Sequence, residues 1–204
     1  MQLAASPHAD HRSAEILGLV RQAFVEKGFD GASMQDLAKA AGMSVGNFYR
    51  YFPSKAAIIL ALVQADHAEV LTTFASIPQA PEPMAALRQM IHLHLSEDCG
   101  APDSELWAEI DAAAKRNPKI GAAVQQMGAA VAAAFVKVFA AETGLTENEA
   151  QRRFSASAAF IMVLFKAASC LNGADPVAQG ELKSMIIRTI DQTLDDVAHF
   201  VRKA

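Results

Sequence analysis

Cysteine is scarce in this 204-residue chain, which contains only Cys99 and Cys170. Two thiols so far apart do not form the dense disulfide framework that stabilises small secreted domains. The first dozen residues also lack an apolar stretch that could serve as the core of a signal peptide. Both absences predict a protein that folds in the reducing cytoplasm.

Long apolar runs and strand patterns are scarce as well. A run such as 156–165 is about half of the roughly 18 to 20 residues that a membrane helix needs, which predicts a soluble protein with no membrane partner. Alternating β-branched runs are few, and no Asn-Gly or Asp-Gly pair lies between two of them. Because 52% of the residues are hydrophobic, the chain can fill a sizeable core. An all-α fold is expected.

The charge balance has no strong excess of either sign, at −4 for the whole chain. The first 55 residues hold six Lys or Arg and five Asp or Glu, a balance of +1, which leaves −5 for the remainder. A nucleic-acid-binding domain is usually more basic than this. Any prediction of DNA binding must therefore depend on local pattern.

That local pattern begins with a helix expected over 13–27, which Gly28 is placed to end. Ser33 stands three residues before Asp36, the spacing of a capping box, and predicts a short helix over 34–41. Gly42-Met43-Ser44 then breaks the helical pattern, and Ser44 can cap a second short helix with Val45, Phe48 and Phe52 inward. Two short helices across a tight turn form a helix-turn-helix.

The rest of the chain also reads as helices. Pro53 ends the second short helix, Ser54 caps a long one that continues to the proline-rich segment 78–83, and Thr146 with Glu149 forms a second capping box. We expect nine helices in all, the last five spanning 84–97, 104–116, 118–144, 147–171 and from between 176 and 181 to 202.

The segment from Gly42 to Lys55 closely resembles the recognition-helix signature of the TetR family of regulators. The resemblance covers about residues 12–63, and its upstream part consists of Ile16-Leu17, Ala23-Phe24, Gly28-Phe29, Ser33-Met34 and Leu37-Ala38. It implies an all-α protein with three parts: a flexible tail over 1–11, a three-helix DNA-binding domain over 12–55, and a helical bundle for effector binding and dimerisation over 56–204.

The expected partner of this domain is double-stranded operator DNA. Gly46 and Asn47 leave little bulk near the helix start, so a side-chain amide at 47 can reach a base edge and Val45 can meet a thymine methyl group. The resemblance implies DNA-backbone contacts for Ser33, Tyr49, Tyr51 and Lys55. Lys55 is expected in the first turn of a helix, where the helix dipole does not favour a cation, so a phosphate would explain its position. For Arg50 a base, a phosphate and solvent all remain open. The full expected set is Ser33, Ser44, Val45, Gly46, Asn47, Tyr49, Arg50, Tyr51 and Lys55.

The resemblance further implies a cavity for a small effector among the middle helices. Aromatic and methionine residues at helical spacing more often simply pack in the core. The candidates for lining the cavity are Met90, His94, Trp107, Ile110, Met127, Phe160, Met162 and Phe165. Glu105 and Glu109 are spaced to present two carboxylates to a cationic effector, although a solvated face is the plainer interpretation, as it is for Asp191, Asp195 and Asp196.

The last two helices carry stripes of small and apolar residues that suit an interface. The family pairs these helices with those of a second subunit, and an intrachain core is the alternative interpretation of the same stripes. The stripes comprise Ala156, Ala159, Ala167 and Ala168 on the first helix, and Met185, Ile186, Ile190, Leu194 and Val197 on the second. No metal-binding or catalytic motif is present, so we expect neither an enzyme nor a cofactor. A helical adaptor that binds protein instead of DNA remains the alternative function.

Overall fold

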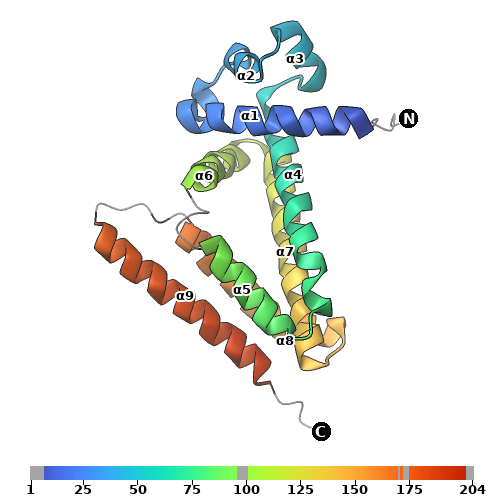
Figure 1. Cartoon of the computed structure of the whole chain (residues 1–204), viewed down its shortest axis with the longest axis vertical. Helices are drawn as coiled ribbons and strands as arrows, with labels where there is room; N and C mark the ends of the chain where they lie inside the picture. The colour runs from blue at the N-terminus through green and yellow to red at the C-terminus, as the bar shows by residue number, and fades with distance from the viewer. Residues whose placement is uncertain (1–6, 96–100, 170, 172–174, 201–204) are drawn as a thin grey trace. The chain divides into compact units, whose positions relative to one another are not determined.

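The computed structural model describes residues 7–95, 101–169, 171 and 175–200. Within these ranges the chain forms nine α-helices and one short 3₁₀ helix, with no strand (Figure 1). The prediction of an all-α fold is confirmed. The elements are α1 (Pro7–Gly31), α2 (Met34–Ala40), α3 (Val45–Tyr51), α4 (Lys55–Ala75), η1 (Ile77–Gln79), α5 (Pro83–Leu95), α6 (Ala101–Arg116), α7 (Pro118–Thr143), α8 (Glu147–Ser169) and α9 (Pro176–Ala198).

The helix ends differ from the expected ones at several places. Residues 7–11, expected to belong to a flexible tail, are the first turns of α1, while the rest of that tail lies outside the described residues. The expected ends of two helices at 97 and 202 also lie outside them. The second capping box is confirmed, because the Thr146 hydroxyl accepts the Glu149 N–H at 3.3 Å and the Glu149 carboxylate accepts the Thr146 N–H at 2.9 Å.

The chain divides into two compact units. The first unit comprises Met1–Ala68 with Pro102–Met127, and the second comprises Glu69–Ala101 with Gly128–Ala204. This division differs from the expected boundary after residue 55, because the first part of α4, most of α6 and the start of α7 belong with the N-terminal helices.

The first unit is organised around one apolar cluster. α1 packs against α2, and α2 against α3, while α4, α6 and α7 contribute further buried side chains. Phe48 and Phe52 belong to this core, as expected, with their ring centroids 5.8 Å apart. The largest fully buried members of the cluster are Phe24, Phe48, Ile16, Leu37, Ile58, Ile59, Leu62, Leu106 and Ile110.

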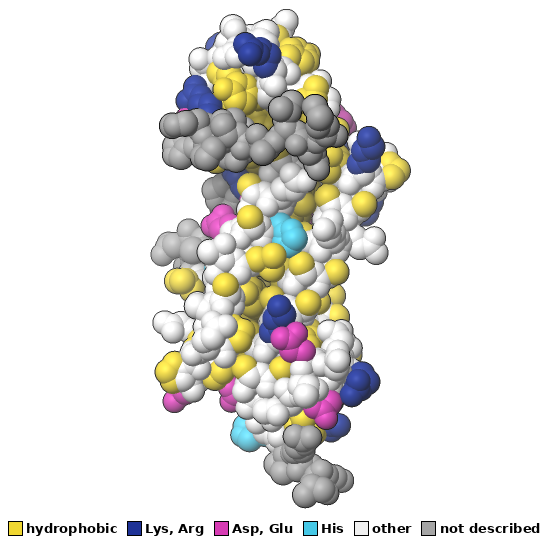
Figure 2. Space-filling view, turned by 90° about the vertical axis from the view of Figure 1, so that its right-hand side faces the viewer, with side chains coloured by type: hydrophobic (Ala, Val, Ile, Leu, Met, Phe, Trp, Pro, Cys, Tyr) yellow, Lys and Arg dark blue, Asp and Glu magenta, His cyan; other side chains and the backbone are white. Residues whose placement is uncertain are grey.

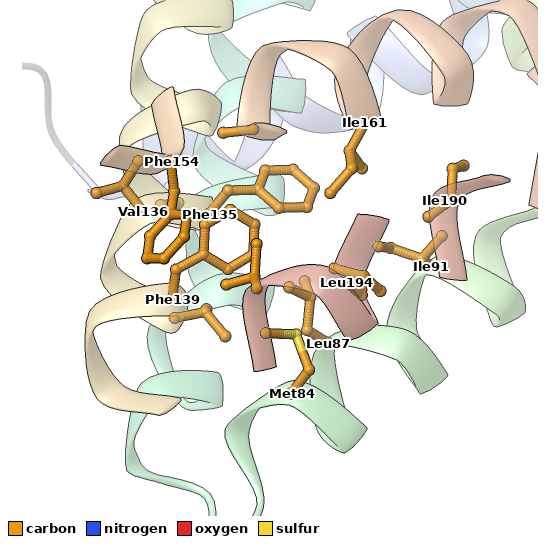
Figure 3. Close-up of a cluster of buried hydrophobic side chains, with 14 of the residues drawn as sticks. Met84, Leu87, Ile91, Phe135, Val136, Phe139, Phe154, Ile161, Ile190 and Leu194 are labelled. Carbon is orange, nitrogen blue, oxygen red and sulfur yellow. The ribbon is translucent and has the colours of Figure 1, made fainter. Parts of the chain in front are cut away.

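The second unit has its own core between α5, the later part of α7, α8 and α9. α5 packs against both α8 and α9 (Figure 1), and Figure 3 shows the side chains of Phe135, Phe139 and Phe154 gathered beside Leu87 and Leu194. The rings of Phe139 and Phe154 meet edge to face at 6.1 Å, an arrangement that aromatic quadrupoles favour.

Two of the three aspartates of α9 are not simply solvated, contrary to expectation. The guanidinium of Arg88 on α5 donates to Asp191 at 2.6 Å and also to Asp195, and His92 Nε2 lies 3.0 Å from Asp191. Sequence spacing along α9 gave no sign of these partners, because they lie on another helix about a hundred positions away. The third aspartate, Asp196, accepts a hydrogen bond from Gln192 and is exposed.

Two segments, Lys55–Gln79 and Pro118–Thr143, are long and apolar enough to cross a membrane by length and composition alone. Core helices of soluble proteins pass the same test. Both segments supply buried side chains to the cores just described, for example Ile58 and Leu62 from the first and Phe135 and Phe139 from the second. Each segment therefore has one face in a core, while 33% and 28% of the two apolar windows are buried.

Candidate nucleic-acid interface

The start of α2 is fixed by the capping box expected from the sequence. The Ser33 hydroxyl accepts the Asp36 N–H at 3.1 Å, and the Asp36 carboxylate accepts the Ser33 N–H at 2.9 Å. Lys27 of α1 also donates to this carboxylate, and these hydrogen bonds, that of Lys27 foremost, hold the pKa of Asp36 well below its usual range. The Ser33 hydroxyl is exposed at the start of α2, so its expected DNA contact stays a prediction.

A tight turn connects α2 to α3. Gly42 has φ +64°, a left-handed conformation that glycine adopts without steric cost, and the Met43 N–H donates to the Ala38 carbonyl at 2.9 Å. Ser44 then caps α3, because its hydroxyl accepts the Asn47 N–H at 3.3 Å. The predicted helix-turn-helix is therefore present.

α3 buries one side and exposes the other. Phe48 is its only fully buried side chain, whereas Gly46, Asn47 and Arg50 are exposed and Tyr49 keeps 47% of its surface accessible. Val45 is also exposed, so its expected inward position is wrong, while its expected role as a base contact remains open. We call Val45, Gly46, Asn47, Tyr49 and Arg50 the α3 face.

Tyr51 and Lys55 lie at the edge of this arrangement. Tyr51 is half-buried and packs on the core of the first unit. The Lys55 ammonium donates to the carbonyls of Phe29 and Asp30 at 2.8 and 3.1 Å. These carbonyls end α1, so a cation here does have a helix-dipole partner, although in another helix. An ammonium has three N–H donors, which leaves one for a phosphate.

Two cations of the helix-turn-helix have no carboxylate within 4 Å in the part of the chain that the structure describes. Lys39 lies in the last turn of α2 and Arg50 in the last turn of α3, and both are exposed. By contrast Arg12, Lys27 and Arg116 each pair with a carboxylate. Nothing in the sequence singles out Lys39, because a single lysine on an amphipathic helix has no distinguishing pattern.

Charge is dispersed on the molecular face drawn in Figure 2. Dark blue and magenta side chains are scattered there among white and yellow surface, and one of each lies side by side near the middle of the view. This face has no broad basic patch. The charge balance of the first 55 residues, at +1, is likewise small.

The expected effector-lining residues fall into both units. Ile110 is buried in the core of the first unit, and Trp107 and Met127 pack against it. Met90, Met162 and Phe165 pack against the core of the second unit, where the His94 ring lies 6.4 Å from that of Phe165. Phe160 keeps 46% of its surface exposed on α8. The structure thus brings His94 and Phe165 together and gives Ile110 a core position.

The two glutamates expected to act as a pair have different environments. Glu105 is exposed. Glu109 is half-buried, and its carboxylate accepts the backbone N–H of Phe29 at 2.7 Å. A solvated face is therefore correct for Glu105 and wrong for Glu109, whose partner lies 80 positions away in the chain.

The stripes on the last two helices divide between core and surface. Ala168, Ile186, Ile190, Leu194 and Val197 are buried within the second unit, so the intrachain alternative is correct for them. The exposed apolar side chains of these helices are offset from that buried row. We call them the α8/α9 face: Phe160, Val163, Val177, Leu182 and Met185.

The helix-turn-helix is the part of the chain that matches a known protein family. Residues 16–62 match the family described as bacterial regulatory proteins, tetR family. Residues 16–62 are thus a TetR-family helix-turn-helix domain. Two similar relatives are HTH-type transcriptional regulators: EthR of Mycolicibacterium smegmatis, 45% identical over 60 residues, and UidR of Escherichia coli, 31% identical over 122 residues. This family consists of regulators and not of enzymes.

These two matches cover only part of each protein. The 60 residues make up 29% of this chain and 28% of EthR, and the 122 residues make up 60% of this chain and 59% of UidR. The chain thus matches less than two thirds of the length of these relatives. Salmonella enterica GusR has the same fold over 97% of this chain and 99% of its own, with a TM-score of 0.72 and 23% identity.

Proposed function

We propose that this chain is a cytoplasmic TetR-family repressor that binds a palindromic operator as a homodimer and is released by a small effector. The observation that carries the proposal is the α3 face. A short helix anchored by buried Phe48 turns small and polar side chains outward, within the segment that matches the family. No packing requirement explains an exposed Asn47-x-Tyr49-Arg50 pattern on such a helix.

The proposed DNA contacts follow from the chemistry of the α3 face. Placed in a major groove, Asn47 offers a donor and an acceptor to a base edge, and Val45 offers a methyl contact. The Tyr49 hydroxyl and the unpaired cations of Lys39 and Arg50 suit phosphates. Ser33, Ser44, Gly46, Tyr51 and the free N–H of Lys55 complete the proposed interface.

The proposed dimer interface is the α8/α9 face. Val163 and Met185 keep 64% and 55% of their surfaces exposed in the single chain. Together with the other members of the α8/α9 face they offer the apolar surface that we propose a second copy buries. A two-fold dimer would place its α3 helices about 34 to 36 Å apart, one turn of DNA.

The proposed effector site is less constrained. His94 and Phe165 with neighbouring Met90 or Met162 offer a mainly apolar surface with one imidazole. On α4, Nε2 of His67 is buried without a hydrogen-bond partner among the described residues, a polar atom that sequence analysis did not single out. Whichever groups bind the effector, it shifts the regulator off DNA only by the difference between its affinities for the DNA-binding form and the released form.

The test is selection from a random duplex library of roughly 30 base pairs, long enough for two half-sites. The full-length protein is incubated with the library in moderate salt, and the bound duplexes are sequenced. Enrichment of a palindrome supports the proposal and supplies a probe, called here the selected duplex. Absence of enrichment overturns operator recognition. In that case, binding to a protein partner with an affinity that does not fall steeply with salt would indicate the alternative function, a helical adaptor.

Asn47→Ala is expected to relax base discrimination. Loss of one bidentate base contact costs about 1 to 3 kcal/mol of discrimination, so the preference at one position of each half-site should fall roughly 5-fold to 150-fold. The readout is repeated selection with the variant. Asn148→Ala, the same substitution at an exposed position of α8, is the matched control and should leave the selected sequence unchanged.

Tyr49→Phe is expected to weaken binding equally at all sequences. It removes a hydroxyl and nothing else, and the loss of two hydrogen bonds per dimer, each about 0.5 to 1.5 kcal/mol, corresponds to roughly a 5-fold to 150-fold rise in Kd. Fluorescence anisotropy with the selected duplex and with one half-site scrambled measures both affinities. An unchanged Kd for both duplexes would remove Tyr49 from the interface.

A further inference from the structure

The turn between α1 and α2 departs from helical geometry at one residue. Gly28 has φ +70° and ψ 165°, which only glycine adopts readily. After this break the Ala32 N–H donates to the Gly28 carbonyl at 3.1 Å, so a new single turn begins at Phe29. The direction of the chain into α2 therefore depends on how this turn is held.

One carboxylate and one ammonium hold the turn at opposite ends. Glu109 of α6 accepts the Phe29 N–H at 2.7 Å, at the end where N–H groups are free. Lys55 of α4 donates to the Phe29 and Asp30 carbonyls at the other end and lies 5.1 Å from the Phe29 ring centre. Both charges have the sign that the peptide dipoles of the turn favour.

The Glu109 contact differs from an ordinary surface ion pair. Its carboxylate oxygens lie 3.6 and 3.7 Å from where a Cβ on Gly28 would be, so the group is seated directly against the break. The nearby Arg116–Asp30 pair, at 3.3 Å, is exposed on both sides and contributes little. Removal of Glu109 instead leaves a half-buried backbone N–H without its acceptor.

The position of this turn bears directly on the α3 face. Ser33, the cap of α2, follows the turn by two residues, and α2 packs against α3. We infer that Glu109 is a positioning residue for DNA binding: with Lys55 it holds the α1–α2 turn in the conformation that sets α2 and α3 against DNA. This inference rests on the proposed function, since it assigns a residue remote from the α3 face to operator affinity.

The test compares Glu109→Ala and Glu109→Gln with Glu105→Gln in the full-length protein. Glu105 lies one helical turn away, is exposed, and has no contact to the α1–α2 turn among the described residues. The first readout is hydrogen exchange of the Phe29 amide by NMR, which needs no DNA. We expect exchange at least tenfold faster in Glu109→Ala, a smaller change in Glu109→Gln, which keeps one acceptor oxygen, and no change in Glu105→Gln.

The second readout is the Kd for the selected duplex over a range of salt concentrations. Glu109→Ala should raise Kd about tenfold while leaving the slope of log K against log salt unchanged, because the protein still neutralises the same number of phosphates. Arg50→Ala should lower that slope by about 0.9 for each phosphate that the variant no longer neutralises. A generally destabilised protein would instead have a smaller active fraction, which titration of binding sites detects, without a change in Kd.

The outcomes separate the inference from the function on which it rests. Unchanged Phe29 exchange in Glu109→Ala overturns the contact itself. Faster exchange with an unaltered Kd overturns the positioning role. Failure of the wild-type protein to select any duplex overturns the proposed function, while the exchange measurement still reports on the turn.

Discussion

Phe48→Ala is expected to lower the free energy of unfolding of the helix-turn-helix by about 3 to 5 kcal/mol, the range for truncating a buried phenylalanine. Phe48 has no exposed surface and is the only buried side chain of the seven-residue α3. A helix this short is not stable by itself, so its tertiary anchor decides whether it forms. Binding to the selected duplex should disappear together with the helix.

The measurement is urea unfolding followed by circular dichroism, with anisotropy for binding. Tyr49→Ala removes an aromatic ring from the neighbouring, exposed position and is the matched control: stability should change by less than about 1 kcal/mol while binding weakens. Phe48→Leu keeps most of the apolar volume and should retain both folding and binding. Wild-type binding by Phe48→Ala would mean that α3 is held by something other than its core contact.

The helix-turn-helix was predictable because its signals are local. The Ser33–Asp36 capping box, the Ser44 cap and the glycines at 28 and 42 act within a few residues, so adjacent positions determine their effect on the backbone. Phe48 and Phe52 could be assigned to the core for the same reason. Val45 could not, because a position at the first turn of a short helix lies near the boundary between the inward and outward faces.

The contacts between distant segments were not predictable from one sequence. Glu109 and Phe29 are 80 positions apart, and Arg88 and Asp191 are 103 apart. A carboxylate on a helix has the same local pattern whether it faces water, an N–H group or an arginine. Similarly, the apolar stripe of α9 indicated a buried face, but not that α5 and α8 of the same chain would cover most of it.

The apolar side chains of α9 divide into a row that is buried inside the chain and a group that is exposed. Because Ile186, Ile190 and Leu194 are used inside the chain, the proposed dimer is assigned to the offset α8/α9 face. Met185→Glu is expected to dissociate the dimer, raising its dissociation constant at least 100-fold, because a carboxylate without a partner is costly to bury between apolar surfaces. In the single chain Met185 is 55% exposed, so the variant should fold normally.

Sedimentation velocity at micromolar protein measures this change, and Val163→Glu on α8 should have the same effect. Ala141→Glu, at an exposed position of α7, adds the same charge off the α8/α9 face and should leave the dimer intact. Operator affinity provides the second readout, because a monomer engages one half-site where a dimer engages two. Dissociated variants should therefore bind a full palindrome no better than a duplex with one half-site scrambled. If Met185→Glu and Val163→Glu both remain dimeric, the two-fold interface lies on another surface, and the proposed spacing of the α3 helices loses its basis.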